Sequence, residues 1–243
     1  MARKGSWPSG SRTGAGARGG SPRGAAVRVK TAGRRKASST QWLQRQLNDP
    51  YVREAKRLGY RSRAAFKLAE LDDRFHLLKP GLRVVDLGAA PGGWTQIAVQ
   101  RVGSDRGKGF VLGVDILDMP SIAGATLMRA DFTAAETPVR IKAALGGPAD
   151  IVLSDMAAPA TGHGQTDHLK IVALAEAAYD FATEVLAPGG SFVCKVYQGG
   201  AEGELLQRLK RDFADIRHAK PPASRSESAE VYLVAQGFRR PAA

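Results

Sequence analysis

The chain has 243 residues, a single cysteine, a net charge of +13 and 43% hydrophobic residues. This length fits one domain with a sizeable core plus an extension, and one cysteine excludes an intrachain disulfide. No apolar run approaches the roughly 18–20 residues of a membrane span, and the N-terminus lacks the apolar stretch of a secretory signal. We therefore expect a cytoplasmic protein that does not enter the membrane.

Most of the positive charge lies at the N-terminus. Residues 1–40 contain ten Lys or Arg, no Asp or Glu and eight glycines, whereas the other 203 residues carry 26 basic and 23 acidic side chains. The segment shows no apolar periodicity, so it cannot bury enough surface to offset its ordering entropy. We expect residues 1–37 to form a disordered basic tail, and residues 38–240 to form the folded domain. The tail is either a solubilising extension or an arm that binds a polyanion.

The next two segments have the spacing of helices. Residues 41–58 mix apolar and basic positions, and residues 61–78 repeat apolar side chains every three or four positions until Pro80-Gly81. From residue 82 onward, short apolar runs alternate with helical stretches near 93–102, 138–145, 168–187 and 202–213. The expected strands are LRVVDLG (82–88), GFVLGVD (109–115), ATLMRAD (125–131), ADIVLSD (149–155), SFVCKVY (191–197) and EVYLVAQ (230–236), with a shorter one at ADIRHAK (214–220). This alternation predicts an α/β domain with a mainly parallel, doubly wound sheet.

Aspartates recur at or near the ends of these runs, at Asp86, Asp115, Asp131 and Asp155. One such residue usually caps the next turn. Ligands of an open α/β sheet bind outside the carboxyl ends of its strands. Four acids along that edge therefore predict a ring of carboxylates beside a ligand-binding crevice.

The first strand leads into a glycine-rich loop, VVDLGAAPGGW (84–94). Its G-x-x-x-G-G spacing differs from the dinucleotide pattern G-x-G-x-x-G, and the G-K-[ST] of a phosphate-binding loop is absent. Acids near the loop disfavour pyrophosphate and suit a cationic ligand with ribose hydroxyls and an amino group. Asp115 is placed to accept from ribose hydroxyls, and Asp131 is placed to accept from an adenine amine. These features together indicate S-adenosylmethionine.

Several long motifs carry a family resemblance. They are RSRAAFKL (61–68), VVDLGAAPGGW (84–94), LSDMAAP (153–159), LAPGGSFVCKVYQG (186–199) and SRSESAEVYLVA (224–235). With SSTQWLQRQLNDPYV (38–52) as an N-terminal helix, the chain resembles the FtsJ-like (RrmJ-type) methyltransferases over about residues 38–237. The resemblance implies a Rossmann-like methyltransferase fold whose seven-stranded sheet includes an antiparallel strand. It also implies methyl transfer from S-adenosylmethionine to a ribose 2′-hydroxyl, of a uridine, in 23S ribosomal RNA of the large subunit.

The resemblance also implies site residues by matching position. The family's Lys-Asp-Lys-Glu tetrad falls on Lys67, Asp155, Lys195 and Glu230. The family's cofactor contacts fall on Gly92, Trp94, Asp115, Asp131 and Asp155.

The chemistry of methyl transfer to a hydroxyl suggests a role for each residue of the tetrad. The hydroxyl is a poor nucleophile that needs positioning and help in losing its proton. We predict that Lys195 meets the 2′-hydroxyl and that Asp155 pairs with Lys195. Lys67 would lower the pKa of Lys195 and Asp155 would raise it, so the sequence leaves its protonation state open. Glu230 reaches the site if its strand runs antiparallel to the others.

Spacing alone leaves ordinary structural roles open for the same residues. Lys67 could be a surface charge, Lys195 could reach solvent from its strand end, and Asp155 and Glu230 could be caps. A non-catalytic RNA-binding assembly factor, or a methyltransferase of another RNA, is the alternative function, and the intact tetrad favours the ribosomal enzyme.

Other residues bear on partners. The basic residues RSR (61–63), Arg53, Lys56 and Arg57 are expected near RNA phosphates. The four histidines lack metal-ligand spacing, so no metal is expected. The sequence carries no oligomerisation signal, and we expect a monomer bound to ribosomal RNA or the large subunit.

Overall fold

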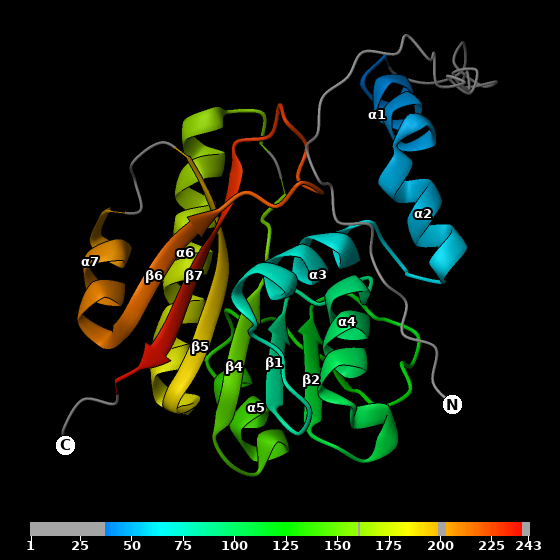
Figure 1. Cartoon of the computed structure of the whole chain (residues 1–243). Coiled ribbons are helices and arrows are strands. Elements are labelled where there is room, and N and C mark those ends of the chain that lie inside the picture. The colour runs from blue at the N-terminus through cyan, green and yellow to red at the C-terminus, as the bar shows by residue number, and fades with distance from the viewer. Residues whose placement is uncertain (1–36, 160, 199–202, 240–243) are drawn as a thin grey trace, which may run out of the picture. The chain divides into compact units, whose positions relative to one another are not determined.

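A computed structural model describes residues 37–159, 161–198 and 203–239. The chain divides into two compact units, residues 1–48 and 49–243. In the first unit the structure describes one helix, α1 (Ala37–Asn48), drawn in blue in Figure 1. The predicted basic tail, residues 1–37, lies outside the described residues except for Ala37, which begins α1.

The helical prediction for residues 41–58 is confirmed, with a break at Asp49. Helix α1 ends at Asn48, and α2 (Pro50–Leu58) starts afresh. Proline suits the first turn of a helix because its missing N–H would have no partner there. The Asp49 carboxylate caps α2 by accepting a hydrogen bond of 3.0 Å from the backbone N–H of Tyr51.

The second unit is built on one seven-stranded sheet with the order β3-β2-β1-β4-β5-β7-β6. The strands are β1 (Arg83–Leu87), β2 (Phe110–Asp115), β3 (Thr126–Arg129), β4 (Ala149–Ser154), β5 (Leu186–Tyr197), β6 (Phe213–Ala219) and β7 (Glu230–Phe238). Neighbours from β3 to β5 pair in parallel, whereas β7 pairs antiparallel with both β5 and β6. In Figure 1, β1 and β2 point upward and β7 points downward. The predicted Rossmann-like α/β fold with an antiparallel strand is confirmed.

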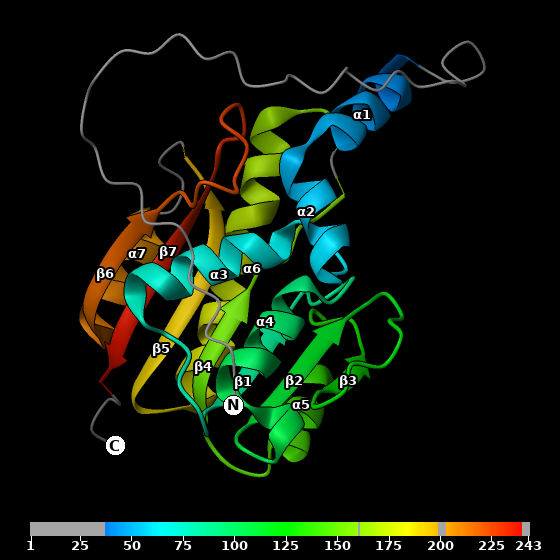
Figure 2. The ribbon, with the colours of Figure 1, turned by 45° about the vertical axis from the view of Figure 1, so that its right-hand side comes forward.

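Helices cover both faces of this sheet (Figures 1 and 2). They are α3 (Ala64–Phe75) and α4 (Gly93–Val102) on one face, and α5 (Thr137–Leu145), α6 (Gly164–Val185) and α7 (Gly203–Asp212) on the other. Each face has its own buried apolar cluster, as expected for a doubly wound sheet. Leu68 of α3 and Ile97 of α4 belong to the first cluster, together with Val111 of β2.

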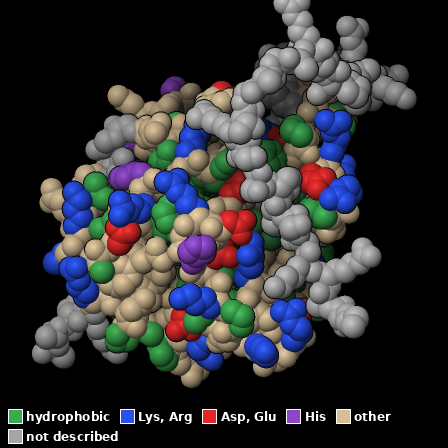
Figure 3. Space-filling view, in the orientation of Figure 1, with side chains coloured by type: hydrophobic (Ala, Val, Ile, Leu, Met, Phe, Trp, Pro, Cys, Tyr) green, Lys and Arg blue, Asp and Glu red, His purple; other side chains and the backbone are tan. Residues whose placement is uncertain are grey.

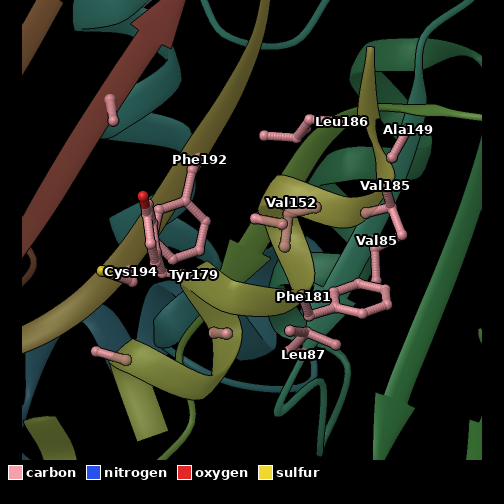
Figure 4. Packing of buried hydrophobic residues seen from close by; sticks show 14 of the residues in the cluster. Val85, Leu87, Ala149, Val152, Tyr179, Phe181, Val185, Leu186, Phe192 and Cys194 are labelled. Atoms are coloured by element: carbon pink, nitrogen blue, oxygen red, sulfur yellow. The ribbon is translucent and has the colours of Figure 1, made fainter. Parts of the chain in front are cut away.

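The second cluster lies between the sheet and α6 (Figure 4). Tyr179 and Phe181 of α6 project toward the sheet, and the rings of Tyr179 and Phe192 lie 6.2 Å apart in an edge-on arrangement. Cys194 is fully buried in this cluster, and burial raises the pKa of its thiol. The only cysteine of the chain is therefore a core residue.

Strand order fixes where a ligand can bind. β1 has β2 on one side and β4 on the other, so the chain order reverses between β1 and β4. In open α/β sheets the crevice lies at such a reversal, outside the carboxyl ends of the strands. Because β7 is antiparallel to β5, its first residue lies at this same edge: Glu230 is the register partner of Tyr197, the last residue of β5.

Candidate active site

Lys195 lies near the end of β5, and only 7% of its side chain is exposed. Its Nζ donates to the backbone carbonyl of Asp155 at 2.8 Å and lies 3.1 Å from Oδ1 of the same residue. Asp155 directly follows β4, the parallel neighbour of β5. The buried ammonium is therefore compensated by two oxygens of one residue, as a buried charge requires.

Lys67 reaches the same edge from α3. Its Nζ lies 2.5 Å from Oε1 of Glu230, and 14% of each side chain is exposed. The same Nζ lies 3.2 Å from the Tyr232 hydroxyl. The structure thus brings together all four predicted tetrad residues, as two ion pairs: Lys67 with Glu230, and Lys195 with Asp155.

Tyr232 joins these two pairs, and sequence reasoning missed it. Its hydroxyl lies 3.0 Å from Asp155 Oδ1 and 3.1 Å from Glu230 Oε1. The side chain is fully buried; burial, followed by the charges of Asp155 and Glu230, raises its pKa well above the usual value. The hydroxyl therefore stays protonated and can donate to either carboxylate while it accepts from Lys67. One sequence signal pointed to Tyr232: it lies two residues after Glu230, and side chains two positions apart in a strand are on the same face.

The glycine-rich loop turns sharply between β1 and α4. The backbone N–H groups of Gly88 and Ala89 both donate to the carbonyl of Val114, at 2.9 and 3.1 Å. Gly92 has a φ of 112° and precedes α4. This φ strains any residue with a side chain, and a Cβ at Gly92 would also lie 2.7 Å from Ile122 Cδ1, the flexible end of a side chain that would have to move.

Two predicted cofactor acids stand at neighbouring strand ends. Asp115 closes β2 and accepts from the N–H of Ala90 and of Leu117, both at 2.8 Å. Asp131 follows β3, is exposed, and accepts from the hydroxyl of Thr133 at 2.7 Å and from its N–H at 2.9 Å. These hydrogen bonds to Thr133 lower the pKa of Asp131. Both acids thus lie at the edge where strand order predicts the ligand crevice.

Trp94 differs from the other predicted cofactor residues because its side chain is buried, with 3% exposed. Its Nε1 donates to the Ala64 carbonyl at 2.9 Å, and its ring centroid lies 5.5 Å from that of Tyr232. The indole therefore links the start of α3 to β7. A direct contact between Trp94 and a cofactor stays a prediction.

Known proteins are similar to this chain in sequence and in fold. A family model described as FtsJ-like methyltransferase matches residues 60–238. The chain belongs to the FtsJ-like methyltransferase family. A Paramagnetospirillum magneticum protein named ribosomal RNA large subunit methyltransferase E is 64% identical over 98% of both chains. A Rhodospirillum rubrum protein of the same name is 67% identical over 88% of this chain and 81% of its own.

A solved structure agrees with the family assignment. It is a Plasmodium falciparum protein assigned as a ribosomal RNA methyltransferase, with 29% sequence identity and a TM-score of 0.65. The match covers 74% of this FtsJ-like methyltransferase and 98% of the other chain.

Asp86 occupies an unexpected place in this FtsJ-like methyltransferase. It is fully buried within β1 and does not lie on the rim of the crevice, so the predicted ring of four carboxylates is wrong at this member. Thr95 Oγ1 donates to its Oδ2 at 2.7 Å, while Oδ1 has no partner among the described residues. Burial, followed by the charges of Asp155 and Asp115, raises the pKa of Asp86 to about 7.

Two of the basic residues expected near RNA phosphates have internal partners. The Arg61 guanidinium donates to the carbonyls of Pro120 and Ser121, both at 2.7 Å. Arg63 lies 2.5 Å from Asp49 Oδ2. Both side chains hold segments of this FtsJ-like methyltransferase together; Asp49 compensates the charge of Arg63, whereas the carbonyl partners of Arg61 leave its charge in place.

The other basic residues expected near RNA phosphates lie on α2. Arg53, Lys56 and Arg57 of α2 are exposed, and Arg57 pairs with Glu54 at 2.6 Å. On the face in Figure 3, outside the part that grey atoms cover, Lys and Arg side chains are interspersed with Asp and Glu. In the parts of the chain that the structure describes, no three His, Cys, Asp or Glu side chains form a metal-binding group, and no helix is long and apolar enough to cross a membrane.

Proposed function

We propose that the chain transfers a methyl group from S-adenosylmethionine to a ribose 2′-hydroxyl in 23S ribosomal RNA. The observation that carries this proposal is the buried Lys195, which is held by two oxygens of Asp155 at the ligand-binding edge of the sheet. Because Asp155 already compensates the charge of Lys195, the lysine can hydrogen-bond to one uncharged hydroxyl without a further ion pair. The names of the relatives support large-subunit ribosomal RNA as substrate, and we propose a uridine as the target nucleotide.

The residues at the edge of β1, β2 and β3 fit S-adenosylmethionine. Asp115 and Asp131 supply carboxylates for ribose hydroxyls, an amine and a positive charge. Ile116 and Leu117 follow Asp115 with 59% and 63% exposed, and they offer apolar surface to a purine. Gly92 and the backbone around it would line the cofactor, together with Asp155 and Trp94. When bound, the cofactor supplies the electrophilic methyl group.

Lys195 orients the nucleophile. A lysine nitrogen has three positions besides its Cε bond, and Asp155 takes two of them. The third faces the 2′-oxygen, either as an N–H that holds the oxygen or as a lone pair that accepts its proton. In both protonation states the hydroxyl is fixed along the line of displacement, and positioning of this kind lowers the barrier. The pH dependence of the rate distinguishes the two states.

The remaining tetrad members keep this arrangement electrically balanced. Lys67 neutralises Glu230, and the Tyr232 hydroxyl connects that pair to Asp155. Two cations and two anions converge, so the site as a whole carries no net charge when all four are ionised. Asp155 is thereby held for Lys195 while Lys67 stays within reach of the substrate's phosphate and ribose oxygens.

Further proposals concern the whole protein. Residues 38–240 form the methyltransferase domain and residues 1–37 a basic tail that contacts RNA. The protein acts as a cytoplasmic monomer.

Transfer of radiolabelled methyl groups to large ribosomal subunits that lack 2′-O-methylation tests the proposed function. The expected product resists alkaline cleavage at one position of 23S RNA, because a methylated 2′-oxygen cannot attack the neighbouring phosphate. A label found on a base would refute the proposed position of transfer. If the protein binds subunits and free ribosomal RNA yet labels neither, it is a binding factor and not an enzyme.

A further inference from the structure

We propose that three charged residues position Lys67 against Glu230, an inference that rests on the proposed function. Asp49, Arg63 and Arg225 form what we call the Asp49 clamp. Oδ2 of Asp49 lies 2.5 Å from Arg63 and 3.4 Å from Arg225. The carboxylate side chain is only 8% exposed, and those of the two arginines are 15% and 29% exposed.

The clamp joins the two segments that carry the outer ion pair of the tetrad. Arg63 directly precedes α3, and Lys67 follows one helical turn later. Arg225 lies in the loop between β6 and β7, five residues before Glu230. Asp49 binds both arginines at once, so it fixes the start of α3 relative to the loop that leads into Glu230.

Further contacts tie this loop to the same helix. Arg63 also donates to the carbonyl of Ala223, and the N–H of Ala223 donates to Glu70 Oε2 of α3 at 2.7 Å. Ala223 is fully buried and packs against Phe66 of α3. The next residue, Ser224, donates from its hydroxyl to Glu230 Oε1 at 3.2 Å. A continuous set of contacts therefore runs from Asp49 to the carboxylate that pairs with Lys67.

The substitution Asp49→Asn isolates the charge of the clamp. Asparagine still accepts from the N–H of Tyr51, so the cap of α2 is kept. The negative charge between Arg63 and Arg225 is lost, and a largely buried cation and a partly exposed one are left without the carboxylate between them. We expect kcat for RNA methylation to fall roughly 10- to 100-fold, since a small misplacement of site groups has effects of this size. Affinity for S-adenosylmethionine should not change.

A double-mutant cycle separates positioning from general stability. If the clamp acts through Glu230, Asp49→Asn lowers kcat strongly in the wild-type background and little in the Glu230→Gln background. Equal fold-losses in both backgrounds would overturn the proposal. Asp73→Asn is the matched control, because it removes an exposed ion pair with Arg101 from the other end of α3. Its kcat should match that of the wild type.

Amide hydrogen exchange gives a readout that does not depend on activity. We expect residues 223–229 to exchange faster in full-length Asp49→Asn than in the wild type, while β5 and α4 stay unchanged. Unchanged exchange in 223–229 would contradict the clamp. If the wild type methylates no RNA, the proposed function fails, and exchange still decides whether the clamp orders this loop.

Discussion

Replacing Asp86 with asparagine tests the energetic role of a buried carboxyl group beneath the glycine loop. Burial raises the pKa of Asp86 from 3.8 to about 7. Between these two values the folded state binds more protons than the unfolded state. The contribution of Asp86 to stability is therefore present below the unfolded pKa and is lost as the pH rises through about 7.

The size of the effect follows from linkage. With these two pKa values, the free energy of unfolding of the wild type falls by roughly 2–3 kcal/mol between about pH 5 and about pH 8 through Asp86 alone. Asparagine does not titrate, and its side-chain oxygen can still accept from Thr95. The variant should therefore lack this loss, so its stability relative to the wild type should rise between about pH 5 and about pH 8.

Urea unfolding at several pH values measures the difference. Other titrating groups are present in both proteins, so their contributions cancel when the two curves are subtracted. Parallel curves for wild type and Asp86→Asn would show that the pKa of Asp86 is not raised in the folded state.

Two other substitutions test the loop and the hydroxyl link. Gly92→Ala should destabilise the fold by about 1–3 kcal/mol and weaken S-adenosylmethionine binding, because a φ of 112° strains any side chain and the new Cβ would displace the Cδ1 of Ile122. Thermal melting measures the loss of stability, and calorimetric titration measures the loss of cofactor affinity. Gly107→Ala is the control, because its φ is 72° and no atom lies within 4 Å of its Cβ. Equal losses of stability in both variants would show that the φ and the crowding at Gly92 have no special effect. Tyr232→Phe keeps the ring but removes the hydroxyl shared by Asp155 and Glu230, so kcat should fall roughly tenfold, about the worth of one hydrogen bond. Steady-state kinetics with saturating cofactor checks this, and an unchanged kcat would show that the hydroxyl does not matter.

Local pattern was sufficient to predict most of the fold. Alternating apolar runs and helical stretches give the strands and helices of the second unit, since both periodicities are properties of neighbouring residues. The break between α1 and α2 was also available, because Asp49-Pro50 is a helix-start signal. Helical spacing continues through it, and this concealed the break.

The site was less accessible to sequence reasoning. The tetrad residues came from motif resemblance, and the antiparallel direction of β7 explains how Glu230 reaches the others. Tyr232 was missed because a tyrosine in an apolar strand looks like an ordinary core residue. The carbonyl partners of Arg61, on Pro120 and Ser121, were also missed, because they lie about 60 residues away in the chain and no local pattern indicates them.

We propose that Lys195 serves the reaction and not the fold, and one comparison tests this most directly. Lys195→Ala and the control Lys79→Ala, at an exposed position, are compared with the wild type for methyl transfer to unmethylated large subunits and for S-adenosylmethionine binding. We expect Lys195→Ala to bind the cofactor as the wild type does but to transfer no measurable methyl, while Lys79→Ala is fully active. Wild-type rates of methyl transfer in Lys195→Ala would show that Lys195 has no role in the reaction.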